Sequence, residues 1–219
     1  SKLIKNKKIN QANEIQNKSL ELSLLLSLPA SVALIIGSDE IVNALFGYGS
    51  FTENDIKQTS LALRYFGYGI PAFAGLKIFA NFFFARDNTM TPFKISSIIV
   101  ITNVVISVLF FKKFGFVIIP IATTLSSWIG ILYYLYILLK IRYLKIQPKF
   151  YTKLIKIVFS TSFVSYIFYN SLNYFAKNLI YSNDYKILYL LFIVIFVALL
   201  YFLICYFLKV LNLRSFKTN

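Results

Sequence analysis

The sequence predicts an all-α fold, a polytopic membrane helix bundle with six transmembrane helices. Hydrophobic residues make up 58% of the chain, charged residues 14%, and the mean hydropathy is +0.69. Soluble domains carry about 25% charged residues, too many for this composition to match. Long uncharged runs approach or exceed the roughly 18 residues that a transmembrane helix needs. The Lys and Arg residues lie in the gaps between these runs, as they do in the loops of membrane proteins.

The charge distribution and the residue types exclude several classes of function. The net charge is +15, but its placement between apolar runs argues against a nucleic-acid partner. Histidine is absent, which excludes histidine-based acid–base and metal chemistry. Neighbouring carboxylates on one helix do not face each other, so the acidic residues form no acid–base pair. We therefore predict a chain that is not an enzyme and has no organic cofactor, with its single cysteine, Cys205, buried and inert.

The first span illustrates how the helices are predicted. Residues 22–37 are apolar, but 16 residues of helix measure only about 24 Å, slightly less than a bilayer core. The amphipathic stretch 38–46 is expected to complete the crossing at the interface. Thr52 is a candidate N-cap for the next helix, because Glu53 and Asp55 follow it in the first turn. The other five spans are predicted at residues 60–84, 95–111, 117–139, 154–175 and 187–208.

These spans divide the chain into five segments. We predict a basic connector at 1–21, four transmembrane helices at 22–140, a basic linker at 141–153, two more helices at 154–208 and a tail at 209–219. The connector could also be a helix at the membrane surface. The segments on one side hold 16 of the 23 Lys and Arg residues and those on the other side hold 6, with Lys77 between them. The positive-inside rule therefore predicts cytoplasmic connector, linker, tail and turn 84–92.

Candidate binding residues lie on the second span and in the turn that ends it. Lys77 lies nine residues, or about 13 Å, before Arg86. A cation at that depth is costly unless it faces a wet cavity or a partner, so Lys77 could contact an anionic ligand or could snorkel to the interface. Arg86 and Asp87, followed by Thr91 and Pro92, could form a gate at the mouth of a cavity. The favoured interpretation is that Arg86 anchors the helix end.

Polar residues also lie inside the third and fourth spans. Asn103 and Ser107 are one helical turn apart, and Thr123 lies on the next span. Their neutral oxygens could hold a small cation such as Na⁺. Such residues more often make hydrogen bonds between helices, and we favour that interpretation.

Four stretches resemble the MurJ (MviN) family of lipid II flippases. They are 28–34 (LPASVAL), 45–52 (LFGYGSFT), 69–73 (GIPAF, followed by Lys77) and 83–92 (FFARDNTMTP). The last is similar to the family's FYARxDxxTP turn. The order and spacing agree from the beginning of the chain to about residue 140, and the later part matches as two further hydrophobic helices.

The resemblance implies that the chain is helices nine to fourteen of a fourteen-helix transporter of the MOP superfamily. The first four helices would belong to its second lobe, and the last two would line a groove for lipid tails. The implied substrate is lipid II, carried to the periplasmic leaflet of the inner membrane by alternating access during peptidoglycan synthesis. Implied partners are membrane lipids and the missing N-terminal half. Some members bind a cation through Asn, Asp and Thr, and here Asn103 and Thr123 match while Ser107 replaces the Asp.

Two alternatives stay open at this point. The chain could belong to a flippase for another polyprenyl-linked glycan, of the O-antigen type. It could also be a membrane scaffold protein that transports nothing, in which case Lys77 and Arg86 would only anchor helices. Residues upstream of Ser1 would discriminate between these possibilities.

Overall fold

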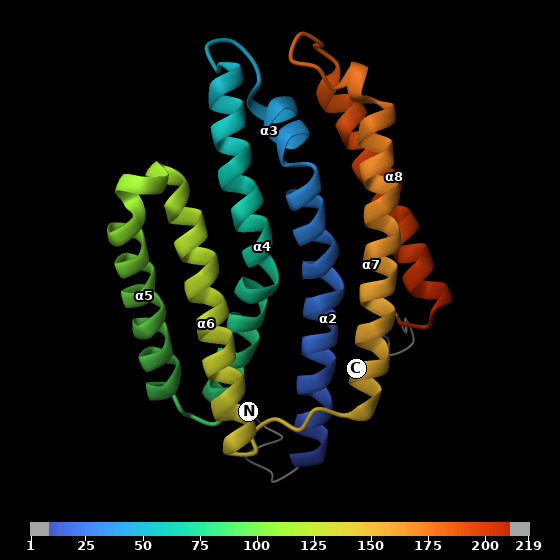
Figure 1. Ribbon diagram of the computed structural model, residues 1–219. Helices are drawn as coiled ribbons and strands as arrows, with labels where there is room; N and C mark the ends of the chain where they lie inside the picture. Colours follow the sequence, from blue (N-terminus) through green and yellow to red (C-terminus); the bar gives the residue numbers. More distant parts are fainter. Residues whose placement is uncertain (1–8, 211–219) are drawn as a thin grey trace.

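The computed structural model describes residues 9–210, and within that range every regular element is helical. Six helices are long and one, α3, is short (Figure 1). Their bounds are α2 Ile9–Ile36, α3 Ser38–Phe46, α4 Glu53–Phe84, α5 Met90–Phe114, α6 Ile118–Lys140, α7 Pro148–Tyr174 and α8 Lys186–Phe207. Two 3-10 turns, η1 Gly115–Val117 and η2 Ala176–Asn178, lie in the connections.

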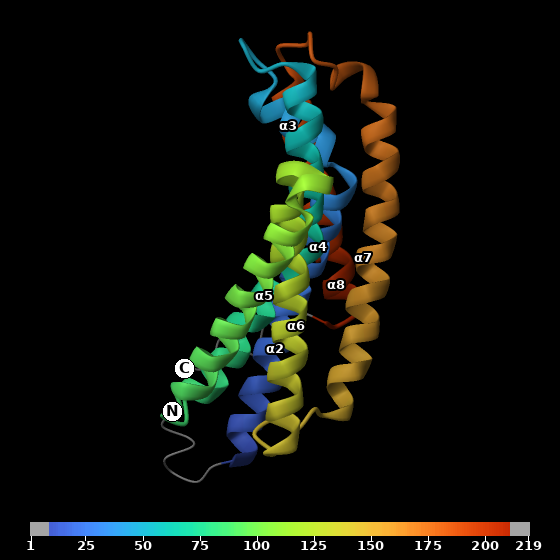
Figure 2. The same ribbon diagram turned by 60° about the vertical axis from the view of Figure 1, so that its left-hand side comes forward.

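The long helices lie side by side in an order that differs from their order along the chain. Helix α5 packs on α6, α6 on α4, α4 on α2, α2 on α7, and α7 on α8 (Figures 1 and 2). We call one end of the bundle the linker end, because it holds the connection 141–147 and the turn 85–89. We call the opposite end the loop end, because it holds the connections 47–52 and 175–185.

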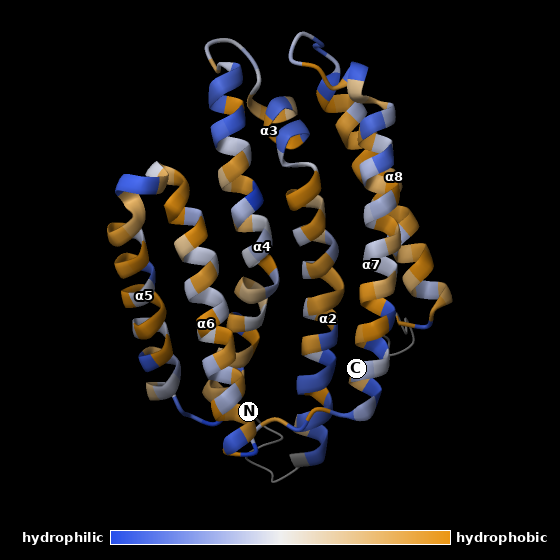
Figure 3. Ribbon diagram, in the orientation of Figure 1, coloured by the Kyte–Doolittle hydropathy of each residue, from blue (hydrophilic) through white to orange (hydrophobic). Residues whose placement is uncertain are grey.

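The apolar surface of the bundle agrees with a membrane protein. Within residues 9–210, three stretches are long and apolar enough to cross a membrane: Asn10–Ile36, Met90–Lys140 and Lys186–Phe207. The second stretch contains both α5 and α6, which are joined by η1. Hydrophilic residues gather at the two ends of the bundle, while apolar residues dominate the lengths of the helices (Figure 3). The predicted all-α membrane bundle of six long helices is therefore confirmed.

Two helices begin earlier than the apolar runs alone suggested. Helix α2 starts at Ile9, inside the predicted connector, and α7 starts at Pro148, inside the predicted linker. The reason at α2 is a polar contact: Asn17 Nδ2 donates to the carbonyl of Lys145 (2.8 Å), and Gln147 N donates to Asn17 Oδ1 (3.1 Å). Buried amides therefore extend α2 against the linker. Residues 1–8 and 211–219 of the predicted connector and tail lie outside the described range.

The predicted start of α4 is confirmed in detail. The Thr52 hydroxyl accepts from the Asp55 backbone N–H, and the Asp55 side chain accepts from the Thr52 N–H. This reciprocal capping box satisfies two donors that a helix start otherwise leaves unpaired. Pro92 lies in the first turn of α5, where a missing N–H costs nothing.

Prolines inside two helices create hydrogen-bond acceptors for neighbouring helices. Pro71 has no N–H, so the Gly67 carbonyl of α4 cannot receive its usual helical bond, and the Ser31 hydroxyl of α2 donates to it (2.7 Å). One residue further on, the Tyr68 carbonyl accepts from Trp128 Nε1 of α6 (3.0 Å). These bonds tie α4 to the helix on either side of it.

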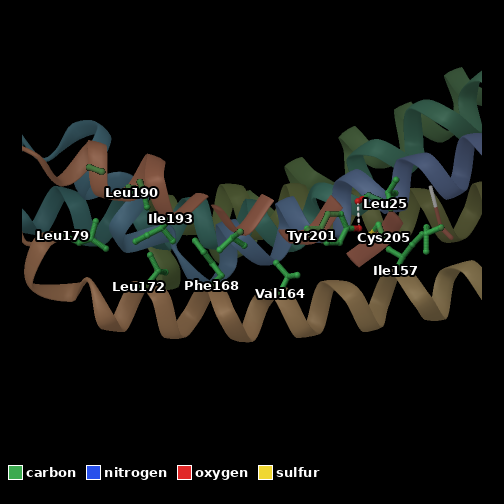
Figure 4. Close-up of a cluster of buried hydrophobic side chains, with 13 residues drawn as sticks. Leu25, Ile157, Val164, Phe168, Leu172, Leu179, Leu190, Ile193, Tyr201 and Cys205 are labelled. Atoms are coloured by element: carbon green, nitrogen blue, oxygen red, sulfur yellow. Dashed lines mark hydrogen bonds between the residues drawn. The ribbon is translucent and has the colours of Figure 1, made fainter. Parts of the chain in front are cut away.

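The same arrangement recurs at the other proline. Pro29 in α2 leaves the Leu25 carbonyl without its helical donor, and the Tyr201 hydroxyl of α8 donates to it (2.8 Å). Figure 4 shows this bond within a cluster of buried side chains that come mainly from α7 and α8, with Leu25 of α2 and Leu179 of the connection 175–185. Helix α8 is therefore attached to α2 through a backbone acceptor that a proline exposes.

Candidate functional site

The turn after α4 is held by Arg86. Its Nη1 donates to the Phe82 carbonyl (2.7 Å) and its Nη2 donates to the Tyr143 carbonyl (2.9 Å). The guanidinium also lies over the Tyr143 ring, 4.3 Å from the centroid. Burial lowers the pKa of Arg86, with the neighbouring Tyr143 acting in the opposite direction, but arginine remains charged. Arg86 thus joins the end of α4 to the linker 141–147.

The backbone of this turn is a Schellman motif that ends α4. Asn88 N donates to the Phe83 carbonyl and Asp87 N to the Phe84 carbonyl, both at 3.1 Å. Asp87 has φ +58°, the left-handed conformation that glycine usually supplies at this position. The charged residue therefore stands where the chain reverses, exposed to the surroundings of the bundle.

Thr91 and Pro92 start α5 with help from a residue that sequence reasoning did not single out. Asn88 Oδ1 accepts from the Thr91 N–H and Asn88 Nδ2 donates to the Thr91 hydroxyl, each at 3.0 Å. The spacing of Asn88 and Thr91, three residues apart before an apolar run, was the available signal for a helix cap. All four predicted turn residues, Arg86, Asp87, Thr91 and Pro92, thus lie together at the linker end.

Lys77 differs from Arg86 in its exposure and in its contacts. Its side chain is exposed on the face of α4 that α2 and α6 leave uncovered, together with Phe66, Asn81 and Phe84 at helical spacing. Within residues 9–210 its ammonium has no hydrogen-bond or ion-pair partner. The structure therefore does not bring Lys77 and Arg86 into one cluster.

The polar residues of α5 and α6 meet as the sequence suggested. Asn103 Nδ2 donates to Thr123 Oγ1 (2.9 Å), and Thr123 Oγ1 donates to the Ile119 carbonyl (2.8 Å). The hydroxyl of Ser107 is buried and has no partner in the described part of the chain. The three side chains offer neutral oxygens only, and two of them already bond each other. The donor set therefore suits a hydrogen bond between helices better than a cation.

An apolar groove lies between α2, α7 and α8. Its volume is about 230 Å³, and its walls include Pro29 and Ala33 of α2, Val164 of α7, and Ala198 and Tyr201 of α8. Small residues on α2 and α8 leave the space open. A groove at the last two helices was implied by the resemblance alone, without these residues. Ala30 and Ala33, at helical spacing on α2, were the available signal in the sequence.

A second hollow of about 260 Å³ lies at the loop end. Its walls carry the carboxylates of Asp39, Glu40 and Glu53. Asp39 is paired with Arg64 (2.8 Å), whereas one oxygen of Glu40 is buried without a hydrogen-bond partner. Burial raises the pKa of Glu40. No group of three or more acidic or cysteine side chains within residues 9–210 is arranged to hold a metal ion.

Comparison with known proteins decides the family. The family described as "Lipid II flippase MurJ" matches residues 1–190. The chain belongs to the lipid II flippase MurJ family. Its relatives include the probable lipid II flippase MurJ of Rickettsia prowazekii, which is 36% identical over 135 residues, and that of Rhizobium tropici, 35% identical over 127 residues. These alignments cover 61% and 58% of this chain but only 27% and 24% of the MurJ relatives.

A solved structure shares the fold. The structure titled "Lipid II flippase MurJ, inward closed conformation" matches with a TM-score of 0.75 at 24% sequence identity. The match covers 94% of this chain and 41% of the solved chain. The described helices therefore share part of the fold of that solved chain. The chain spans about a quarter of the length of the curated MurJ relatives it matches.

Proposed function

We propose that the chain is the C-terminal part of a flippase that moves lipid II from the cytoplasmic to the periplasmic leaflet of the inner membrane. The observation that carries the proposal is the family match over residues 1–190, which covers five of the six long helices completely. Transporters of this kind expose a central site alternately to the two sides of the membrane. The chain supplies helices for that movement and performs no covalent chemistry.

The orientation follows from the distribution of basic residues. Within residues 9–210, the linker end carries more Lys and Arg residues than the loop end, so the linker end faces the cytoplasm and the loop end faces the periplasm. The turn around Arg86 then lies at the cytoplasmic surface. Arg86 acts there as an anchor, because its Nη1 and Nη2 donate to the carbonyls of Phe82 and Tyr143.

Two regions would contact different parts of the substrate. Lys77, exposed and unpaired within residues 9–210, offers a positive charge to the pyrophosphate of the head group. The groove between α2, α7 and α8 offers an apolar surface to the polyprenyl tail. A cation at Asn103, Ser107 and Thr123 is a weaker part of the proposal, because no carboxylate stands among these donors. The remaining helices of the transporter would close the cavity from the other side.

Complementation tests the substrate. The gene encoding this chain is expressed in a strain whose own lipid II flippase can be depleted, and growth and cell shape are followed after depletion. Restored growth supports the proposal, and lysis overturns it when the protein is present in the membrane at normal amounts. A parallel strain that lacks its O-antigen flippase serves as the specificity control. Rescue of that strain alone would assign a different polyprenyl-linked glycan.

A further inference from the structure

Lys186 at the start of α8 is the one charged side chain that is buried among residues 10–210, with 1% of its surface exposed. Its Nζ donates to the Gly47 carbonyl (2.6 Å) and to the Tyr181 carbonyl (2.8 Å). The ammonium also lies 4.0 Å from the centroid of the Tyr48 ring and 4.8 Å from that of Tyr181. Lys186 therefore fastens α8 to the loop that connects α3 and α4.

The buried ammonium of Lys186 restricts the position of the start of α8 relative to the two loops that surround it. Removing a charge from water is costly unless hydrogen bonds and opposing partial charges replace the solvent. Here two carbonyls and two aromatic faces do so, and they come from two separate loops. A shift of α8 along or away from the bundle would separate the ammonium from some of these groups. The start of α8 is therefore fixed more firmly than apolar packing alone would fix it.

Tyr201 supplies a second attachment fifteen residues further along α8. Its hydroxyl donates to the Leu25 carbonyl of α2, which Pro29 leaves without a helical donor. In the described range, Lys186 and Tyr201 are the two α8 residues whose side chains hydrogen-bond to the α2–α6 part of the chain. They are about 22 Å apart along the helix.

The apolar groove lies along the stretch of α8 that these two attachments bound. Val194, Ala198 and Tyr201 line it from α8, and Ala30 and Ala33 line it from α2. Between its two attachments α8 has only apolar packing, on α7 and in the cluster it shares with α2, and no side-chain hydrogen bond to α2–α6 in the described structure. Because hydrogen bonds are directional and apolar packing is not, the two attachments are the contacts that specify how far α8 stands from α2.

We infer that Lys186 and Tyr201 are positioning residues that fix the width of the groove between α2 and α8 and thereby its fit to a polyprenyl chain. The role of the groove rests on the proposed function, whereas the attachment of α8 does not. Neither residue needs to touch the head group of the substrate. Loss of either attachment should let α8 move away from α2 without unfolding the other helices.

Cross-linking across the groove measures this width directly. Ala30→Cys and Ala198→Cys are introduced together in the gene encoding this chain; both positions line the groove and are exposed. Cys205 is completely buried, so it does not compete for the reagent. Bifunctional thiol reagents of graded length are then applied in membranes. The unaltered background should show a sharp optimum at one length.

The variants Lys186→Met and Tyr201→Phe should shift this optimum to longer reagents or broaden it, with at least a threefold loss of cross-linking by the shortest effective reagent. Lys177→Met is the matched control for Lys186→Met, since Lys177 is exposed in the connection that leads to α8. Tyr206→Phe is the matched control for Tyr201→Phe, since Tyr206 is exposed on α8. Both controls should leave the optimum unchanged. Lys186→Arg retains the positive charge and the hydrogen-bond donors, so its optimum should lie close to that of the unaltered background. If Lys186→Met does not fold, Tyr201→Phe carries the test alone.

Flipping assays connect the width to the substrate. In proteoliposomes, the apparent KM for a substrate with a long polyprenyl tail should rise several-fold in Lys186→Met, while that for a short-tailed analogue should change little. Equal effects on both tails, or an unchanged cross-linking optimum, would overturn the inference. If the unaltered protein flips neither substrate, the proposed function fails, and the cross-linking result still decides whether the attachments position α8.

Discussion

Two basic residues, Lys77 on α4 and Arg86 in the turn after it, lie in opposite environments. Arg86, just after the helix, donates to two carbonyls and stacks on Tyr143. Lys77, nine residues earlier, is exposed and has no partner within residues 9–210. A basic residue whose donors are satisfied by its own chain contributes to the fold. One that stays unsatisfied on an open helix face retains its donors for a ligand, which is why we propose an anchoring role for Arg86 and a binding role for Lys77.

The largest effect is expected from removing the Arg86 side chain. Arg86→Ala should lower the free energy of unfolding by about 2–4 kcal/mol, because charge-assisted hydrogen bonds and a cation–π contact are lost together. Unfolding can be followed in detergent by the fluorescence of Trp128, the single tryptophan. Lys77→Ala is the matched control and should leave stability nearly unchanged. Equal losses in the two variants would remove the distinction between the two residues.

The rate of lipid II flipping should be sensitive to Lys77, although stability is not. Lys77→Ala should reduce the rate of lipid II flipping by about tenfold, which corresponds to roughly 1.4 kcal/mol of lost interaction with an anionic group. Its melting temperature should stay at that of the unaltered protein. Lys94→Ala, an exposed lysine on α5, provides the control for a general loss of positive charge. A normal flipping rate in Lys77→Ala would end the proposed binding role.

A smaller loss of stability is expected when the hydrogen bond between Asn103 of α5 and Thr123 of α6 is removed. This pair extends the comparison to uncharged groups. Asn103→Ala should cost about 0.5–1.5 kcal/mol, the range of hydrogen bonds between membrane helices. Sodium should not protect the unaltered protein from thermal unfolding. Ser107→Asp places a carboxylate one turn from Asn103 and should create sodium-dependent protection. Strong protection without that change would instead favour a cation site formed by the neutral oxygens.

The smallest effect concerns Glu40 at the loop end. Burial raises its pKa above the ordinary value of 4.5. The folded protein then holds this proton more tightly than the unfolded chain does, so the stabilisation is complete below pH 4.5 and is lost as the pH rises through the folded-state pKa. Glu40→Gln should remove this dependence and change stability by less than about 1 kcal/mol at neutral pH. Melting curves of both proteins between pH 4 and 8 measure the difference, with exposed Glu53→Gln as the control.

Local chemistry explains which features the sequence could predict. Apolar runs predict the six long helices, and the spacing of Thr52 and Asp55 predicts the start of α4, because both depend on residues close together in the chain. The early start of α2 agrees with the helical alternative for the connector, but its cause could not be predicted, since its polar turns are stabilised by the distant linker. Lys186 could only be counted as a loop lysine. Its partner Gly47 is 139 positions away, and a carbonyl acceptor leaves no trace in the sequence.

In the candidate site, too, features set by residues close together in the chain could be predicted, and features set by distant contacts could not. Grouping Arg86, Asp87, Thr91 and Pro92 required only their adjacency, and the pairing of Asn103 with Thr123 required only two antiparallel helices joined by a tight turn. The walls of the groove come from α7 and α8, which are consecutive, and from α2, which is far from both in the chain. Their meeting is a result of tertiary packing, so it appears only in the structure.

The two internal prolines have a consequence for how this family can change during evolution. Each proline exposes one carbonyl, and each carbonyl is satisfied by a hydroxyl on a different helix: Ser31 for Gly67 and Tyr201 for Leu25. A relative that loses the proline regains its own helical bond and no longer needs the hydroxyl. Position 71 is therefore expected to covary with position 31, and position 29 with position 201, although none of these pairs joins two side chains.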